Sequence, residues 1–329
     1  MVLERSRTGV TTTPDEVSAS PEAQPRVDPS AVADPAGSTV VALAQCYPRL
    51  GDVAANLAIH LAVIGEAAKR HAGLVVFPEL SLTGYFLKDQ VPDVALRLDS
   101  PPVRALRDAS REARTDVVAG LILESDSHRF YNASIYLSAG EVVHVHRKVY
   151  LPTYGLFDEQ RYVAAGDRFR AFDAPLGGRA SNRWRAGILI CEDLWHPSAA
   201  GLLARQGIDL IICPSASPGR GVLQGEGLGT AGSYDAMTRT YAQLFTSYVV
   251  YCNRTGFEDG VGFWGGSRVV GPDGTVLAAL PGTEDTILFH TLERSAVRRA
   301  RVACPLLRDE RNDVNDAETD RLRRHRARD

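Results

Sequence analysis

The sequence predicts an α/β protein in which helices cover both faces of mixed β-sheets. Short apolar runs that indicate strands alternate with longer segments whose apolar residues recur at helical spacing. Tight-turn signals join some of the strands, which indicates that antiparallel pairs accompany the parallel ones. The chain has 329 residues, of which 44% are hydrophobic, so it can bury a large core.

The first half of the body supplies two expected helices and five expected strands. Leu57, Leu61 and Ile64 mark the apolar face of the first helix, and a proline opens the second. A turn at Ser138-Ala139-Gly140-Glu141 joins the last two strands into a hairpin. The helices are expected at 56–69 and 102–114, and the strands at 39–45, 74–77, 117–123, 133–137 and 142–145.

The second half continues the alternation. The turn Gly271-Pro272-Asp273-Gly274 separates two strands within 269–280. Further strands are expected at 185–190, 208–213, 248–252 and 285–290, and helices at 198–206, 230–247 and 292–300. No internal repeat of 20 to 50 residues is visible. One domain is expected over 38–308, between the two terminal segments.

Two segments outside this body differ from it in composition. Residues 1–37 are rich in Pro, Ser, Thr, Ala and charge without apolar periodicity, which predicts a disordered leader. Residues 309–329 form a charged C-terminal tail ending in a basic run at 321–326. We expect this tail to be solvated and frayed.

Composition argues against several classes of function. The formal net charge of −3 favours neither nucleic acid nor an anionic membrane as a partner. No apolar run approaches the roughly 18 residues of a membrane span, and the N-terminus lacks an apolar signal region, so a cytoplasmic protein is expected. The five cysteines include no CxxC pair and suggest neither a disulfide framework nor a zinc ribbon.

Three polar residues follow expected strands, where α/β folds tend to place ligands. Glu79 comes after the strand at 74–77, Lys148 after the one at 142–145, and Cys191 after the one at 185–190. Amide hydrolysis needs a nucleophile, a base and a stabiliser of negative charge. A thiol of pKa about 8.5 is mostly protonated at neutral pH, so Glu79 is expected to activate Cys191 while Lys148 stabilises the oxyanion. This chemistry requires no metal and no organic cofactor.

The sequence around these residues resembles the nitrilase superfamily of carbon–nitrogen hydrolases from about residue 39 to about 311. The segments that carry the resemblance are Phe77-Pro78-Glu79-Leu80, Arg147-Lys148-Val149-Tyr150-Leu151-Pro152 and Cys191-Glu192-Asp193-Leu194-Trp195. The resemblance implies a four-layer α-β-β-α sandwich, a Glu-Lys-Cys triad and at least a homodimer. It also implies that Glu159 is a second glutamate that positions Lys148 and the substrate, and that the Glu192 backbone N–H is a second oxyanion donor.

Within the superfamily, the motifs are most similar to the glutaminase domain of glutamine-dependent NAD synthetases. The similar segments are Phe77-Pro78-Glu79-Leu80-Ser81-Leu82-Thr83-Gly84-Tyr85 and Tyr154-Gly155-Leu156-Phe157-Asp158-Glu159. The synthetase domain that follows in those enzymes is absent from this sequence, so a stand-alone hydrolase is expected. Gly219 replaces a bulkier residue at the place where those enzymes contact glutamine, which argues against strict glutamine specificity.

The expected reaction is hydrolysis of a small linear amide, ω-amide or carbamoyl compound through a thioester, with release of ammonia. The residues expected to contact the substrate are Tyr154, Glu192, Trp195, Ser215 and Ser217. Alternatives within the same chemistry are a true nitrilase and a glutaminase that supplies ammonia to a partner. Further alternatives are a metal site or Cys–His protease built on Cys191 and His196, and a non-catalytic interaction protein on the same fold.

Overall fold

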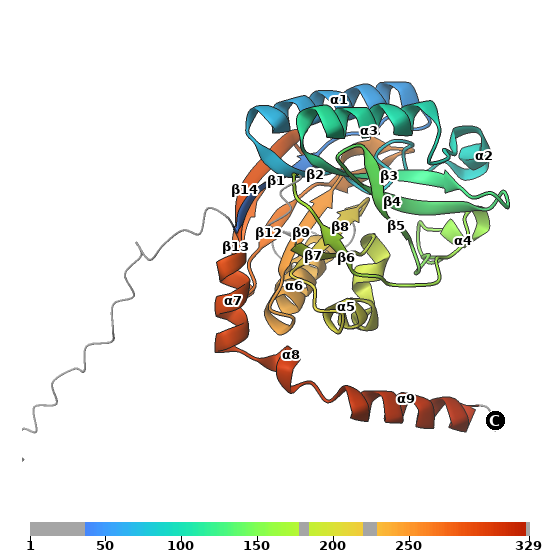
Figure 1. Cartoon of the computed structure of the whole chain (residues 1–329). Helices are drawn as coiled ribbons and strands as arrows, with labels where there is room; N and C mark the ends of the chain where they lie inside the picture. Colours follow the sequence, from blue (N-terminus) through green and yellow to red (C-terminus); the bar gives the residue numbers. More distant parts are fainter. Residues whose placement is uncertain (1–36, 178–183, 220–228, 327–329) are drawn as a thin grey trace, which may run out of the picture. The chain divides into compact units, whose positions relative to one another are not determined.

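The computed structural model describes residues 37–177, 184–219 and 229–326 and contains two six-stranded mixed sheets (Figure 1). The first sheet has the strand order β14-β1-β2-β3-β4-β5. Strands β1, β2 and β3 are parallel, and the outer pairs are antiparallel. Its strands are β1 (Ser38–Gln45), β2 (Ala72–Val76), β3 (Asp116–Glu124), β4 (Phe130–Ser138), β5 (Glu141–Arg147) and β14 (Thr286–Glu293).

The second sheet repeats this plan with the order β13-β12-β9-β8-β7-β6. The central strands β7, β8 and β9 are parallel, and the outer strands are antiparallel to their neighbours. Its strands are β6 (Phe172–Ala174), β7 (Trp184–Ile188), β8 (Leu210–Ser215), β9 (Tyr248–Asn253), β12 (Arg268–Val270) and β13 (Val276–Ala279). A separate hairpin consists of β10 (Thr255–Glu258) and β11 (Val261–Trp264).

Alternating side chains of the first sheet enter two different cores. Val41 and Leu74 pack with residues of the second sheet, whereas Ala42 and Val75 pack with helices α1 (Val53–Lys69) and α3 (Pro101–Ala113). Successive residues of a strand point to opposite faces, so this division places one layer on each side of the sheet. Helices α5 (Pro197–Ala204) and α6 (Gly229–Leu244) cover the second sheet. The result is the expected four-layer α-β-β-α sandwich.

Each strand and helix expected from periodicity has a counterpart, and the additional elements are short apart from the C-terminal helix α9 (Asn312–Arg326). Strand β6, the β10–β11 hairpin and several single turns of helix contain too few residues to show a periodic pattern. The strand expected at 185–190 ends at Ile188, because the chain turns there toward Cys191. The single-turn helices are η1 (Lys88–Gln90), α2 (Val91–Val94), α4 (Glu159–Tyr162), η2 (Cys191–Trp195) and α8 (Leu306–Asp309).

The C-terminal stretch is helical where the sequence analysis expects a frayed end. Helix α7 (Arg294–Ala303) is followed by α8 and then by α9 (Asn312–Arg326), most of whose described side chains are exposed. Acidic residues occupy the first half of α9 and basic residues the second, which complements the helix dipole. Ion pairs of Arg321 with Glu318 and of Arg323 with Asp320 add i,i+3 support. The expected disordered leader lies outside the described residues, apart from Gly37.

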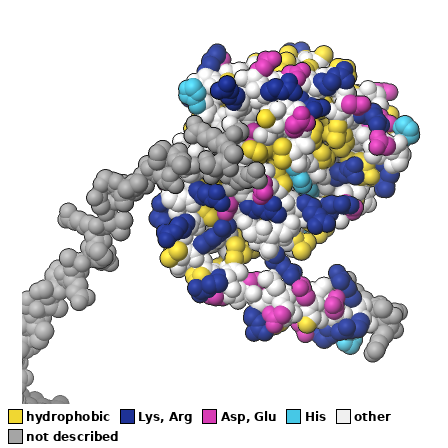
Figure 2. Space-filling view, in the orientation of Figure 1, with side chains coloured by type: hydrophobic (Ala, Val, Ile, Leu, Met, Phe, Trp, Pro, Cys, Tyr) yellow, Lys and Arg dark blue, Asp and Glu magenta, His cyan; other side chains and the backbone are white. Residues whose placement is uncertain are grey.

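Charged side chains of both signs are interspersed over the face of the molecule drawn in Figure 2. This distribution accords with the formal net charge of −3. Among the helices that the structure describes, none is both long and apolar enough to cross a membrane.

Candidate active site

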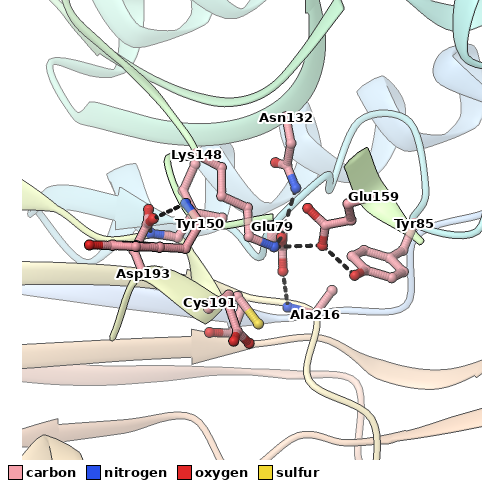
Figure 3. A network of polar contacts seen from close by, with 12 residues as sticks. Glu79, Tyr85, Asn132, Lys148, Tyr150, Glu159, Cys191, Asp193 and Ala216 are labelled. Atoms are coloured by element: carbon pink, nitrogen blue, oxygen red, sulfur yellow. Dashed lines mark hydrogen bonds and ion pairs between the residues drawn. The ribbon is translucent and has the colours of Figure 1, made fainter. Parts of the chain in front are cut away.

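The three candidate catalytic residues meet between the two sheets (Figure 3). Glu79 lies three residues beyond the end of β2, and Lys148 follows β5 directly. Cys191 lies three residues beyond the end of β7 in the second sheet. β2 belongs to the first sheet and β7 to the second, yet the loops after them meet, because Glu79 and Lys148 lie close enough to Cys191 to shift the pKa of its thiol.

Lys148 is a buried cation held between two carboxylates. Its Nζ donates to Glu79 Oε1 and to Glu159 Oε1, each at 2.6 Å (Figure 3). Burial alone disfavours the charged ammonium, but Glu159, Glu79 and Cys191 outweigh it and hold the pKa of Lys148 well above its usual value. Lys148 therefore carries a fixed positive charge in a site from which bulk water is excluded.

The Glu79 carboxylate is oriented by donors from both sheets. Asn132 Nδ2 on β4 donates to Oε1 at 2.8 Å, and the Ala216 backbone N–H just beyond β8 donates to Oε2 at 2.8 Å. Gly120 on β3 makes room for this loop, because a Cβ there would lie 2.3 Å from the backbone nitrogen of Leu80. These contacts fix the Glu79 carboxylate in one orientation before a substrate arrives.

Glu159 shares its Oε1 between Lys148 and a tyrosine. The Tyr85 hydroxyl donates to this oxygen at 2.5 Å. Burial raises the pKa of Glu159 to about 7 and the neighbouring Glu79 adds to the rise, while Lys148 and Tyr85 oppose it. The ionisation state of Glu159 therefore changes near neutral pH.

Cys191 opens the 3-10 helix η2 with an unusual backbone conformation. Its φ of 46° lies in the left-handed region, which non-glycine residues adopt at a cost of about 1–3 kcal/mol. Burial and the charge of Glu79 raise the pKa of the Cys191 thiol, whereas Lys148 and a hydrogen bond with Tyr234 lower it. The resting nucleophile is thus a buried thiol with a carboxylate and an ammonium close enough to shift its pKa.

Asp193 joins the loop of Lys148 to the loop of Cys191. Its Oδ2 accepts from His146 Nε2 at 2.8 Å and from the Ile190 N–H at 3.0 Å. Its Oδ1 accepts from the backbone N–H groups of Val149 at 3.1 Å and Tyr150 at 3.0 Å. Asp193 is fully buried, so water could not take over as acceptor for these four donors if the carboxylate were removed.

The substitution Asp193→Ala is expected to lower the free energy of unfolding by about 3–5 kcal/mol, since it leaves a buried histidine and three backbone N–H groups unpaired. Urea unfolding followed by circular dichroism measures this loss. The matched control is Asp108→Ala, which removes an exposed carboxylate paired with Arg111 and should change stability by less than about 1 kcal/mol. Equal losses in the two variants would contradict this role for Asp193.

Three of the five expected substrate-contacting residues lie in or against the 3-10 helix η2 that Cys191 opens. The Tyr154 hydroxyl donates to both carboxylate oxygens of Glu192 at 3.0 Å. Trp195 is half-exposed and packs edge-on against Tyr234 with ring centroids 5.6 Å apart. Burial raises the pKa of Glu192, opposed by Tyr154 and Lys148. Their contact with a substrate stays a prediction.

The two expected serines are buried and engaged within the protein. Ser215 Oγ lies 3.6 Å from Cys213 Sγ, and Ser217 Oγ accepts from Trp264 Nε1 at 3.4 Å. In the described part of the loop after β8, the Ala216 backbone N–H reaches the catalytic residues by donating to Glu79. A contact of either serine with substrate stays a prediction, and the structure assigns the loop a role in holding Glu79.

The structure adds to the site several residues that the sequence did not indicate. Asn132 looks like an ordinary strand residue, and Ala216 contributes only its backbone. Tyr85 is the last residue of the glutaminase-like motif at 77–85, so the motif could have indicated that Tyr85 belongs to the site. Tyr234 lies 43 positions from Cys191 in an expected helix, and nothing in the sequence connects the two.

The alternatives built on His196 receive no support from the geometry. The His196 ring stacks on Tyr150 with centroids 3.5 Å apart, and its Nε2 lies 4.0 Å from a carboxylate oxygen of Glu192. Asp193 turns away from Cys191 toward His146. Within the described ranges, no cluster of three or more His, Cys, Asp or Glu side chains is arranged to hold a metal ion.

Comparison with known proteins agrees with this fold. The family model for carbon–nitrogen hydrolases matches residues 40–302. The glutamine-dependent NAD(+) synthetase of Thermotoga maritima is 34% identical over 72% of this chain. Mouse omega-amidase NIT2 is 26% identical over 80% of this chain and 92% of its own. The solved structure of NitN amidase from Nesterenkonia sp. AN1 superposes with a TM-score of 0.69 at 25% identity, covering 85% of this chain and 99% of that one.

The fold, the clustered Glu79, Lys148 and Cys191, and the family match define a hydrolase of carbon–nitrogen bonds. The chain belongs to the carbon–nitrogen hydrolase family of the nitrilase superfamily and is an enzyme of that family. It spans less than half the length of the glutamine-dependent NAD synthetases that it matches, namely 39% of the Thermotoga enzyme.

Proposed function

We propose that this enzyme is a cysteine amidase that hydrolyses a small linear amide through a thioester on Cys191. The proposal rests on the position of the Lys148 ammonium. Its Nζ lies 2.6 Å from Glu79 Oε1 and 2.6 Å from Glu159 Oε1, beside the buried thiol of Cys191. This arrangement combines a nucleophile, a base and a fixed positive charge in one water-poor site.

In the acylation half of the reaction, the Glu79 carboxylate takes the proton of the Cys191 thiol and the sulfur attacks the amide carbon. Lys148 and the Glu192 backbone N–H stabilise the oxyanion that forms. Glu79 then gives its proton to the departing nitrogen, and the carbon–nitrogen bond breaks to release ammonia. The acyl group remains attached to sulfur as a thioester.

In the second half, Glu79 takes a proton from a water molecule that attacks the thioester. The carbon–sulfur bond breaks, the acid leaves and the sulfur recovers a proton from Glu79. Glu159 acts through Lys148, because it accepts a hydrogen bond that holds the ammonium at one position throughout the cycle, and Tyr85 holds Glu159 by donating to the same oxygen. A second carboxylate beside Lys148 also keeps it charged when Glu79 is protonated.

A small amide is favoured as substrate because the reacting groups are deeply buried. Cys191 is only 7% exposed, and Glu79 and Lys148 are 1% and 0% exposed. The relatives named as omega-amidase and amidase support an amide over a nitrile. Tyr154 and Glu192, next to Cys191, provide polar groups for a linear substrate, such as an ω-amide or a carbamoyl compound.

A second candidate is a glutaminase that supplies ammonia to a partner protein. The similarity to glutamine-dependent NAD synthetases favours it. A stand-alone amidase should show full activity as the purified chain, whereas an ammonia donor should be slow until its partner is added.

The test is a panel of ω-amides, glutamine, carbamoyl compounds and aliphatic nitriles, read by ammonia release from the purified enzyme. A linear ω-amide or carbamoyl compound is expected to give the highest kcat/KM, with no release by Cys191→Ala. A nitrile as best substrate would replace the amidase assignment. If glutamine were the sole substrate and a partner protein accelerated its turnover, the result would favour the glutaminase that supplies ammonia.

A further inference from the structure

Tyr234 reaches the nucleophile from helix α6, on the layer that covers the second sheet. Its hydroxyl oxygen lies 3.2 Å from Cys191 Sγ, within range of a hydrogen bond to sulfur. The side chain is 1% exposed, so water does not compete for this contact. The catalytic steps above do not use this hydroxyl.

Three aromatic side chains fix the orientation of the Tyr234 ring. Tyr251 lies 4.7 Å away between ring centroids, Trp195 packs edge-on at 5.6 Å, and Trp264 lies at 6.3 Å. Because the ring is held on several sides, the main freedom left to the hydroxyl is rotation of its hydrogen about the C–O bond. The hydroxyl is therefore preorganised toward the sulfur.

When the Cys191 sulfur is ionised, the proton between Cys191 and Tyr234 is bonded to the phenol oxygen of Tyr234. Burial, followed by the charge of Cys191, raises the pKa of Tyr234 well above its usual value, so the phenol stays protonated at neutral pH. Burial and Glu79 raise the pKa of the Cys191 thiol, and the hydroxyl of Tyr234 acts in the opposite direction together with Lys148. Among the described residues, the titratable groups that act on the sulfur are Glu79, Tyr85, Lys148, Cys213, Tyr234 and Tyr251.

We propose that Tyr234 is a further catalytic residue, whose hydroxyl donates a hydrogen bond to the Cys191 thiolate. The inference rests on the proposed cysteine mechanism. The thiolate occurs twice in the cycle: when Glu79 takes the thiol proton, and when the carbon–sulfur bond of the thioester breaks and its electron pair returns to sulfur. Tyr234 keeps its own proton in both steps, so the proton balance through Glu79 is unchanged.

The experiment compares Tyr234→Phe with the parent protein, both in a Cys304→Ala background because Cys304 is an exposed thiol. The rate of Cys191 alkylation by iodoacetamide is followed from pH 7 to 9 by peptide mass mapping, below the raised pKa of the thiol, where the rate is proportional to the thiolate fraction. Loss of the donor should raise the thiol pKa by about one unit, which lowers the alkylation rate about tenfold at each pH, and should lower kcat/KM at pH 7 about tenfold. Site-specific 3-fluorotyrosine at position 234, a stronger donor, should raise the alkylation rate.

The matched control is Tyr241→Phe, which removes a phenol hydroxyl from the same helix where the ring stacks on Phe245. It should keep the parental alkylation profile and turnover, and thermal unfolding should show that both variants fold. An unchanged alkylation profile in Tyr234→Phe overturns the proposal, even if turnover falls. The alkylation readout does not require turnover, so failure of the amidase assignment would be seen separately as activity that survives in Cys191→Ala.

Discussion

Cys191→Ala is expected to lower kcat/KM for the best amide at least about a thousandfold, because it removes the nucleophile. The free energy of unfolding should change by less than about 1 kcal/mol, since one atom is lost and alanine inherits the same left-handed backbone. Ammonia release and urea unfolding measure the two quantities. Electrospray mass spectrometry of the parent during turnover should show the acyl adduct, which the variant should lack.

The matched control for this substitution is Cys46→Ala, because Cys46 is also a buried thiol but packs in the core between the first sheet and its helices. That change should lower stability by about 1–2 kcal/mol and leave kcat/KM within about threefold of the parent. If Cys191→Ala retained more than about a thousandth of the parental rate, the covalent mechanism would be wrong.

Glu79→Gln is expected to slow acylation about 10²- to 10⁴-fold, because it removes the base that takes the thiol proton. The structure adds a second reason for a large effect. Oε1 accepts from Lys148 and Asn132, and Oε2 accepts from the Ala216 N–H. Either orientation of a glutamine amide would point its N–H₂ group at one of these donors, so the Lys148 position is also disturbed. Single-turnover ammonia release measures the acylation step.

The control is Asp116→Asn, which makes the same carboxylate-to-amide change at a buried residue that accepts from the Tyr136 hydroxyl at 2.6 Å. Asp116 begins β3, whereas Glu79 follows the end of the parallel strand β2, so the two lie at opposite edges of the sheet. Asp116→Asn should therefore affect stability more than acylation. Near-normal acylation in Glu79→Gln would transfer the role of base to Glu159.

The layered fold was predictable because its signals are local. Apolar runs such as 39–45 and 248–252, and the helical spacing of Leu57, Leu61 and Ile64, report which faces must be buried. These patterns identified the main strands and helices. They could not identify α4 or the β10–β11 hairpin, because a segment of four residues has no measurable period. They also missed α9, whose helix depends on the ordering of charges and not on an apolar face.

By itself, the sequence determined the candidates for the catalytic chemistry. Glu79, Lys148 and Cys191 each follow a strand within a recognisable motif, so their residue types and their positions at strand ends could be read directly. Glu159 was identified by the same resemblance. The residues, their order and the family were therefore accessible without coordinates.

The tertiary structure alone decided how these groups are held. Asn132, Ala216 and Tyr234 come from β4, the end of β8 and helix α6, and they meet Glu79 or Cys191 across 43 to 137 positions of sequence. Such contacts depend on strand order, on which sheet faces which, and on the direction of each side chain after packing. Local periodicity carries none of this information, because it records only whether a residue is buried and not which residue it is buried against.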